Sequence, residues 1–422
     1  MQPDLEQLKL EVEATCKKAS AAAECLANAS PSEKNKWIQA MADALDEQSD
    51  EILKENDKDM QNGLERGMSP ALLDRLKLTP ERVHSIADSM RFVTKLEDPV
   101  GKTISTFVHK NGLRIEKISV PLGVIGFIFE ARPNVTADAA GLSIKSGNAV
   151  ILRGGSEAIH SSAAIVKAIV AAGTAAGMPD GAVQLLPNTS HDAVSCLLKM
   201  DKFVDVIIPR GGERLIRTVM EQSTIPVLKN YKGVCHVYVD KNADLDMALN
   251  IIVNGKCQRP GVCNAVETVL LHKDILPAFA ERFHKKMLEC HVELRADDEF
   301  RKFVPDVACA DENDYYTEYL ALILAVRTVA SVEEAVAHVN KYGTGHSEAI
   351  ITNDNAAAGY FQNHVDAAAV YWNASTRFTD GGEFGMGAEI GISTDKLHAR
   401  GPMGLPELTT YKYKIYGTGQ TR

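Results

Sequence analysis

Three loops of this sequence gather glycine, asparagine and arginine directly after short apolar runs. They are 130–134 (EARPN), 153–156 (RGGS) and 209–212 (PRGG). A helical pattern follows each loop, so backbone N–H groups at a helix N-terminus are placed to face an anion. One such loop is usually ordinary turn chemistry, but three in succession favour a phosphate-bearing ligand.

Cysteine and histidine give few signs of other familiar chemistry. The eight cysteines, at positions 16, 25, 196, 235, 257, 263, 290 and 309, form no CxxC pair, so we expect free thiols in a reducing compartment. The twelve histidines show no HxxxH or HExxH spacing, and we expect no catalytic metal.

Several glycine motifs are incomplete. Neither GMG at 385–387 nor GTG at 417–419 completes the dinucleotide-binding fingerprint. The segment Gly101-Lys102-Thr103 has Leu96 where a phosphate-binding loop requires its first glycine, and 345–349 (GHSEA) lacks the second glycine of a nucleophile elbow. These four segments are interpreted as ordinary loops.

The elements that must position the first three loops alternate between strands and helices. Strands are predicted at VIGFIF (124–129), AVIL (149–152), VQLL (183–186) and VDVII (204–208), with alanine-rich helical runs between them. This alternation indicates crossover connections and a mostly parallel sheet covered on both faces, that is, an α/β fold. Ligands bind beyond the carboxyl ends of such strands, where these loops lie.

The rest of the chain divides around that sheet. The first hundred residues are predicted to be helical, with a capping box at 30–33 (SPSE) and another helix start at Thr79-Pro80. A second α/β series begins near residues 230–240. The segment 101–119 contains two β-like runs around an Asn111-Gly112 hairpin turn, and the β-rich tail is placed to add to it.

Composition excludes several classes of protein. With 45% apolar and 24% charged residues among 422, the chain is long enough for two or three globular domains. A formal net charge of −10 argues against a general affinity for nucleic acid or anionic membranes. The N-terminus is acidic and polar and no apolar run approaches 18 residues, so we expect a cytoplasmic protein without export or membrane insertion.

Five segments, matching over nearly the whole chain, resemble the aldehyde dehydrogenase superfamily. They are VPLGVIGFIFEARPNVTADAAGL, GNAVILRGGSEA, QRPGVCNAVET, KYGTGHSEAIIT and NASTRFTDGGEFGMGAEIGISTDKLHARGPMGL. The resemblance implies two parallel-sheet α/β domains plus a β-hairpin oligomerisation arm. On this partition the cofactor-binding domain is 1–102 and 120–235 with a return segment at about 381–405, the catalytic domain is 236–380, and the arm is 103–119 and 406–422.

The resemblance selects Cys263 as the nucleophile. Its thiolate is the competent species, and Arg259 with nearby backbone N–H groups would lower the thiol pKa from its free value of about 8.5. The alternative for any one cysteine is a small buried hydrophobic residue, and Cys257 in the same loop serves as an internal control. Asn134 matches an amide that holds the developing oxyanion, unless it only caps the next helix.

For the cofactor, the resemblance implies contacts from Arg153 to the adenosine ribose and from Glu318 to the nicotinamide ribose. Gly211 and Gly212 match the turn near the pyrophosphate. Ser156 stands where NAD-preferring relatives carry a carboxylate, which favours NADP(H).

Within the superfamily the chain resembles the acyl-phosphate reductases of proline biosynthesis. This implies NADPH-dependent reduction of L-glutamyl 5-phosphate to L-glutamate 5-semialdehyde through a cysteine thioester, with release of phosphate. Arg259 is a candidate ligand for the phosphate, because a cation suits it. Candidates for the amino-acid end of the substrate are Asn373, Ser375, Thr376 and Arg377.

One departure separates this reading from its alternatives. Lys229 stands where hydrolytic relatives carry the glutamate that activates water, and no carboxylate occurs between Gln222 and Asp240. The missing carboxylate counts against a hydrolytic NAD(P)-dependent semialdehyde dehydrogenase, which is the second hypothesis. A non-catalytic member of the fold is the third hypothesis, and the presence of both Cys263 and Asn134 counts against it. Lys229 is either a cation that attracts phosphate or a solvent-facing side chain. We also expect a homodimer or homotetramer, with a glutamate kinase as a possible partner.

Overall fold

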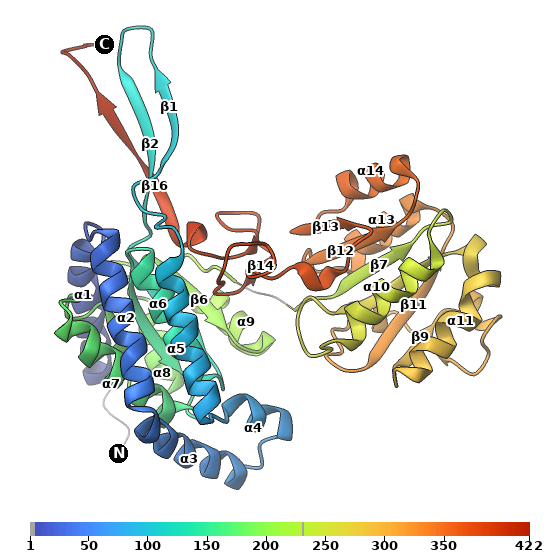
Figure 1. Ribbon diagram of the computed structural model, residues 1–422, viewed down its shortest axis with the longest axis horizontal. Helices are drawn as coiled ribbons and strands as arrows, with labels where there is room; N and C mark the ends of the chain where they lie inside the picture. Colours follow the sequence, from blue (N-terminus) through green and yellow to red (C-terminus); the bar gives the residue numbers. More distant parts are fainter. Residues whose placement is uncertain (1–4, 230–231) are drawn as a thin grey trace. The chain divides into compact units, whose positions relative to one another are not determined.

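A computed structural model describes residues 5–229 and 232–422 (Figure 1). The chain forms two compact units. Unit 1 comprises the residues up to Lys229 together with Met386–Gly391 and Met403–Arg422. Unit 2 comprises the residues that follow Lys229, up to Gly385, together with Ile392–Pro402. None of the described helices has both the length and the apolar content needed to span a lipid bilayer.

Five helices open unit 1, as predicted. They are α1 (Leu5–Leu26), α2 (Pro31–Glu47), α3 (Ser49–Glu65), α4 (Pro70–Leu76) and α5 (Pro80–Lys95). The capping box at Ser30 and Glu33 is confirmed, because each side chain accepts a hydrogen bond from the other residue's backbone N–H. Thr79 likewise caps α5 through the Arg82 N–H, so both starts follow from local hydrogen bonding.

A four-stranded parallel sheet in the order β5-β4-β3-β6 forms the core of unit 1. The strands are β3 (Val124–Phe129), β4 (Ala149–Gly154), β5 (Val183–Leu185) and β6 (Val206–Arg210), connected through α6 (Pro133–Lys145), α7 (Ile159–Ala175) and α8 (His191–Leu197), with α9 (Glu213–Gln222) following β6. β3 and β4 are buried along their whole length, as expected for parallel strands covered on both faces. The three predicted glycine- and arginine-containing segments therefore lie at the ends of β3, β4 and β6, but β4 and β6 each extend two residues further than predicted, to Gly154 and Arg210.

Unit 2 contains a seven-stranded parallel sheet in the order β10-β9-β11-β8-β7-β12-β13. Its strands are β7 (Cys235–Val239), β8 (Val266–His272), β9 (Glu293–Ala296), β10 (Ala308–Cys309), β11 (Ile323–Val329), β12 (Ser347–Ile351) and β13 (Ala369–Trp372). Its helices are α10 (Leu245–Cys257), α11 (Leu276–Glu289), α12 (Asp298–Arg301), α13 (Val332–Tyr342) and α14 (Asn355–His364), with 3-10 turns η1 (Lys273–Ile275), η2 (Asp314–Tyr316) and η3 (Thr376–Phe378). The predicted α/β class is confirmed for both units.

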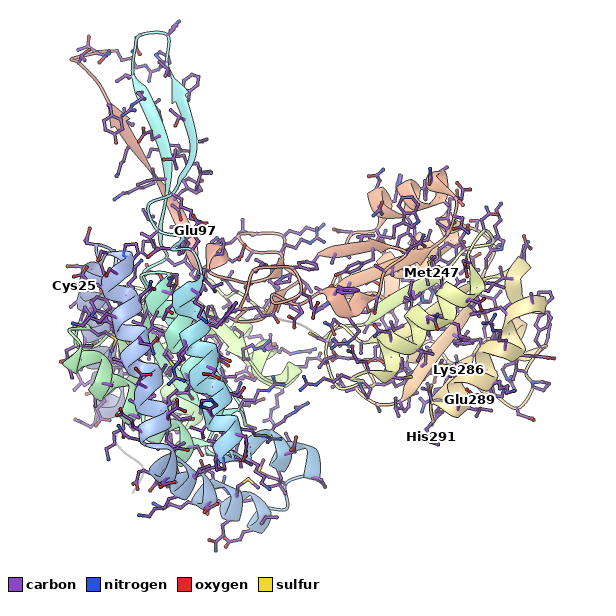
Figure 2. The ribbon with its side chains drawn as sticks, viewed as in Figure 1. Cys25, Glu97, Met247, Lys286, Glu289 and His291 are labelled. Carbon is purple, nitrogen blue, oxygen red and sulfur yellow. The ribbon has the colours of Figure 1, made fainter. Side chains whose placement is uncertain are left out.

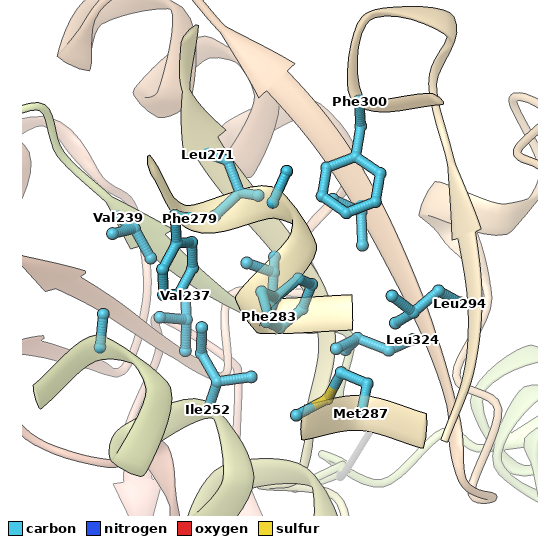
Figure 3. Close-up of a cluster of buried hydrophobic side chains, with 14 of the residues drawn as sticks. Val237, Val239, Ile252, Leu271, Phe279, Phe283, Met287, Leu294, Phe300 and Leu324 are labelled. Carbon is cyan, nitrogen blue, oxygen red and sulfur yellow. The ribbon is translucent and has the colours of Figure 1, made fainter. Parts of the chain in front are cut away.

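The largest core cluster of unit 2 lies under α11 (Figure 3). Phe279, Phe283 and Met287 recur at four-residue spacing on one face of α11 and pack on the sheet. The rings of Phe279 and Phe283 are stacked with centroids 5.6 Å apart, and Phe300 meets Phe283 edge-on at 6.1 Å. Burying each such side chain stabilises the fold by about 1.5–3 kcal/mol, which gives the sheet a rigid support.

A three-stranded antiparallel sheet forms the predicted arm. It pairs β1 (Thr103–Val108) with β2 (Arg114–Pro121), and β2 with β16 (Thr409–Tyr416) near the C-terminus, beside one another in Figure 1. The turn lies at Asn111-Gly112 as predicted, with Gly112 at φ 89° in the left-handed region. β1 and most of β16 are exposed, including Phe107 and Ile415, so the arm buries little apolar surface within one chain.

The predicted return segment at 381–405 is divided by the structure. Only 386–391 and 403–405 belong to unit 1, whereas 392–402 belongs to unit 2. The reason is local: β14 (Ile392–Ser393) pairs with β15 (Gly401–Pro402), and Lys396 and Arg400 both pair with Asp366 of unit 2. The chain passes from unit 1 to unit 2 after Lys229, earlier than the predicted 235. The 3-10 turn η4 (Pro406–Leu408) then leads into β16.

Candidate active site

Cys263 lies in the turn between α10 and β8, and it is partly exposed. The buried thiol of Cys235, at the start of β7, donates a hydrogen bond to the Cys263 carbonyl oxygen at 3.2 Å. Gly233 passes so close that a Cβ there would lie 1.7 Å from the same carbonyl oxygen. Only glycine fits at 233, so backbone packing fixes the position of the Cys263 main chain.

Asn264 connects this turn to η3. Its Nδ2 donates to the Thr379 carbonyl at 2.9 Å, and the Thr376 hydroxyl donates to the Asn264 carbonyl at 2.7 Å. The Arg377 guanidinium donates to Asn264 Oδ1 and, at 3.1 Å, to Gln258 Oε1. Thr376 and Arg377, predicted as substrate ligands, are therefore held directly beside the turn between α10 and β8, which we call the nucleophile turn because it carries Cys263, the predicted nucleophile.

Two guanidinium groups, those of Arg259 and Arg377, lie in this region together with the carboxylates of Asp380 and Glu383. Burial and the nearby charge of Arg259 lower the pKa of Arg377, whereas Asp380 and the Cys263 thiol act in the opposite direction. Arg259 itself is exposed. A cavity of about 180 Å³ adjoins them, lined by Asn254, Gln258, Arg377, Phe378, Asp380 and Glu383. An anion next to the thiol would be attracted by the two guanidinium groups and repelled by these two carboxylates.

Asn373 and Ser375 occupy different positions from those two residues. The Asn373 amide bonds at both ends to the Thr352 backbone, accepting from its N–H and donating to its carbonyl at 3.0 Å each. Ser375 is buried, and its hydroxyl oxygen accepts from the Arg377 N–H at 3.3 Å. Both side chains hold the backbone of 373–377 in place, because their polar atoms are already engaged.

A buried ion pair closes the base of the nucleophile turn. Lys256, near the end of α10, donates to Glu267 on β8 at 2.5 Å, and both side chains are fully buried. Burial lowers the pKa of Lys256 and raises the pKa of Glu267 to about 7. The charge of each residue and the hydrogen bond between them partly offset these two shifts. Sequence reasoning missed this pair. The signal was available, since both charges interrupt otherwise apolar runs.

The same pair reaches the loop that carries Glu318. Glu267 also accepts from the Leu320 N–H at 3.3 Å, and Glu318 accepts from the Gly233 N–H at 2.8 Å. Glu318, predicted to bind a ribose, thus lies at the nucleophile turn and supports the glycine that packs on Cys263.

Cys257 has a different environment from Cys263. It ends α10 and packs against the core of unit 2. Burial and the neighbouring Cys290 thiol raise the pKa of Cys257 to about 11, which disfavours its thiolate. Cys257 is therefore poorly suited to be the nucleophile.

Asn134 stands in the first turn of α6 and is exposed. The alternative that it caps this helix is wrong, because the N-cap is Arg132 and Asn134 already lies inside the helix. Its Nδ2 instead donates to Asp138 Oδ2 at 3.1 Å, one turn further along. Asp138 thereby fixes which end of the amide carries the N–H groups, a role that sequence reasoning missed despite the four-residue spacing.

Hydrogen bonds from backbone N–H groups to carboxylates connect the loops after β3, β4 and β6. Glu157 accepts from the Ala131 N–H at 2.6 Å, and Glu130 accepts from the Gly212 N–H at 2.8 Å. A Cβ at Gly211 would lie 2.4 Å from the Glu130 carboxylate. Two of the N–H groups expected to face a ligand anion thus face side chains of the protein itself.

Arg153 and Ser156 lie at the end of β4 and in the loop after it. Arg153 is buried and donates to the Thr189 and Ser190 carbonyls, while its Nε has no hydrogen-bond partner among the described residues. Ser156 is exposed and lies 3.3 Å from Arg66 Nη1, a cation that sequence reasoning missed because it comes from the end of α3. Lys229, the last described residue before 230–231, is partly buried.

Comparison with known proteins decides the family. The family model described as aldehyde dehydrogenase family matches residues 6–302 and 306–396. The chain belongs to this family. A curated gamma-glutamyl phosphate reductase of Moorella thermoacetica is 54% identical over 413 residues, covering 98% of this chain and 99% of the relative. Another, from Carboxydothermus hydrogenoformans, is 53% identical and covers 96% and 98%.

Solved structures agree with these relatives. The crystal structure of gamma-glutamyl phosphate reductase from Thermotoga maritima matches this aldehyde dehydrogenase family member with a TM-score of 0.96 and 46% identity, covering 98% of this chain and all of that one. An acetylating aldehyde dehydrogenase from Geobacillus thermoglucosidasius shares the fold, with a TM-score of 0.71 and 18% identity. The predicted family and fold are confirmed, and membership implies a nicotinamide cofactor.

Proposed function

We propose that this enzyme reduces L-glutamyl 5-phosphate to L-glutamate 5-semialdehyde and releases phosphate, in proline biosynthesis. The observation that carries the proposal is the partly exposed Cys263 thiol with Arg259 and Arg377 beside it. A guanidinium group at the predicted nucleophile favours a substrate whose leaving group is an anion, since it can pair with that group as it leaves. The similarity to curated gamma-glutamyl phosphate reductases over nearly the whole chain supports this substrate class.

The chain's own residues account for the acyl-transfer step. The Cys263 thiolate attacks the γ-acyl carbon, a sulfur–carbon bond forms, and the bond from that carbon to the phosphate oxygen breaks. Phosphate leaves with the electron pair, next to the two guanidinium groups. Asn134, oriented by Asp138, donates to the oxyanion that develops on the acyl oxygen, an effect worth about 3 kcal/mol for a well-placed donor.

The residues near the end of β4 fit a nicotinamide dinucleotide. The Arg153 Nε is buried without a partner among the described residues, and Arg66 beside Ser156 offers an exposed cation and hydroxyl. We infer that Arg66 and Ser156 bind the 2′-phosphate of NADP(H), with Arg153 supporting their loop, Gly211 and Gly212 near the pyrophosphate and Glu318 at the nicotinamide ribose. When bound, this cofactor supplies the reducing equivalent that converts the thioester to the aldehyde.

The rival function is hydrolysis of the thioester. Lys229 stands in the segment where a hydrolytic enzyme needs a general base, and the sequence has no carboxylate between Gln222 and Asp240. The test is the reverse reaction, following NADPH formation from glutamate 5-semialdehyde with and without inorganic phosphate. Phosphate dependence supports the reductase, whereas rapid turnover to glutamate in phosphate-free buffer would support the hydrolytic dehydrogenase instead.

The arm favours a homodimer or homotetramer. Exposed apolar side chains on β1 and β16, including Phe107 and Ile415, need a further surface to cover them. A glutamate kinase that hands over the unstable acyl phosphate is a possible partner. Light scattering at micromolar concentration tests the first proposal, and an active monomer would contradict it.

A further inference from the structure

An acidic cavity lies in unit 1, directly beyond Asp138. Its volume is about 260 Å³, and its walls come from α5, α6 and the segment 387–389. Two carboxyl groups, those of Asp138 and Glu389, line it, and no lysine or arginine belongs to this lining. A concave site of this size and charge suits a small cationic group.

Asp138 is incompletely paired in this cavity. Its Oδ2 accepts from Asn134, but its Oδ1 has no hydrogen-bond partner among the described residues. Burial raises the pKa of Asp138 to about 6, against the smaller opposite effects of Asn134 and of Arg210 on β6. The group is thus largely a carboxylate at neutral pH, and a partially desolvated carboxylate with a spare oxygen gains from a cationic ligand.

We propose that Asp138 binds the α-ammonium group of the substrate in this cavity. The proposal rests on the proposed function, in which Asn134 contacts the reacting acyl group. Asn134 and Asp138 lie on one face of α6, four residues apart, and their side chains are in contact, with Nδ2 and Oδ2 separated by 3.1 Å. In a glutamyl substrate, three carbon–carbon bonds and one carbon–nitrogen bond separate the acyl carbon from the ammonium nitrogen, so one substrate can place its acyl oxygen at the Asn134 amide and its ammonium group at the Asp138 carboxylate.

The assignment explains a preference for amino-acid substrates. A simple aldehyde or acyl phosphate would use Cys263 and Asn134 equally well, but it would leave the Asp138 carboxylate without its counter-ion. Asp138 is then a specificity-determining residue as well as the residue that orients the Asn134 amide.

The test compares two aldehydes that differ only by the ammonium group, glutamate 5-semialdehyde and glutaric semialdehyde, in the phosphate-dependent oxidation. Asp138→Asn keeps the shape and an acceptor oxygen for Asn134 but removes the charge. We expect the wild-type preference in kcat/KM for the amino substrate to fall by about 10- to 100-fold in D138N. Glu389→Gln, which removes the other carboxylate of the cavity, is the matched control and should change the preference less than about threefold.

Two other outcomes would overturn the proposal. An equal loss on both aldehydes would show that Asp138 acts only through Asn134, and a changed preference in E389Q alone would move the ammonium site to Glu389. Calorimetric binding of L-glutamate against glutarate provides a readout without turnover. If the wild type lacked phosphate-dependent activity while D138N still altered this binding ratio, the proposed reaction would fail and the ammonium site would stand.

Discussion

The nucleophile turn of unit 2 and the strand-end loops of unit 1 are held in place by partly different contacts. In unit 2, a buried ion pair between side chains, Lys256 and Glu267, closes the turn, and the Glu318 carboxylate accepts from the Gly233 N–H. In unit 1, carboxylates bind backbone N–H groups directly, with Glu130 on Gly212 and Glu157 on Ala131. Backbone N–H groups at a helix start are therefore not available to a ligand merely because the sequence has glycine there, since carboxylates of the protein can occupy them.

The consequence for chemistry differs between the two regions. In unit 2, Arg259 is exposed and Arg377 interacts electrostatically with the Cys263 thiol. In unit 1 the carboxylates already accept hydrogen bonds from these N–H groups, so an anionic ligand there must be bound by side chains such as Arg66. Substitutions in each region can therefore separate the groups that react or bind a ligand from the groups that hold them in place.

Replacing the nucleophile should have the largest effect. Cys263→Ala should lower kcat by at least about 10³-fold, because no other group in the turn can form the thioester. Cys257→Ala, from the same segment, should retain most activity, since burial and Cys290 disfavour its thiolate. Steady-state kinetics and mass mapping of the first cysteine labelled by a thiol reagent check both statements. Loss of activity in C257A with a functional C263A would reverse the assignment.

Breaking the ion pair under the turn should mainly affect stability. Lys256→Met removes the cation that stabilises the buried Glu267 carboxylate, so Glu267 must take up a proton or stay buried as an unpaired charge, and we expect a loss of up to about 3–5 kcal/mol in the free energy of unfolding. The double variant K256M/E267Q, which keeps an acceptor for the Leu320 N–H, should lose less. Urea titration provides the measurement.

Lys286→Met is the matched control for that pair. Lys286 and Glu289 form an exposed pair on α11 at 3.1 Å (Figure 2), so its removal should cost less than about 1 kcal/mol. Equal losses in K256M and K286M would show that the buried pair has no special role.

Cofactor preference should depend on the end of β4. Ser156→Asp places a negative charge beside Arg66, and we expect NADPH binding to weaken by about 10- to 100-fold while NADH binding changes little. Fluorescence titration of both cofactors measures this, with Ser156→Ala as the uncharged control. Equal affinity of the wild type for NADPH and NADH would remove the basis for this site.

The parts of the fold and of the candidate site that the sequence predicts are those that depend on residues close together in the chain. The strands, the capping box at Ser30 and the Asn111-Gly112 turn follow from neighbouring residues. The structure confirms the capping box and the turn, and the strands of the unit 1 sheet lie within two residues of their predicted bounds. The family motif placed Cys263 in a partly exposed turn. The engagement of the Asn373 amide by the Thr352 backbone was not predictable, because it depends on a partner 21 residues away in the chain. Arg66 is 90 residues from Ser156, so no spacing rule connects them.

The smallest expected effect is a pH dependence of stability that comes from Asp138. Burial raises its pKa from 3.8 to about 6, so between these values the folded state binds more protons at this site than the unfolded state does. The contribution of Asp138 to stability is therefore greatest below about pH 4 and is lost as pH rises through about 6. Asp138→Asn removes this titration, and the stability of D138N relative to wild type should increase by about 1–3 kcal/mol from pH 4 to pH 7. Parallel urea titrations of the two proteins across this range measure the difference, and a constant difference would mean that solvent in the cavity keeps the Asp138 carboxylate at its ordinary pKa.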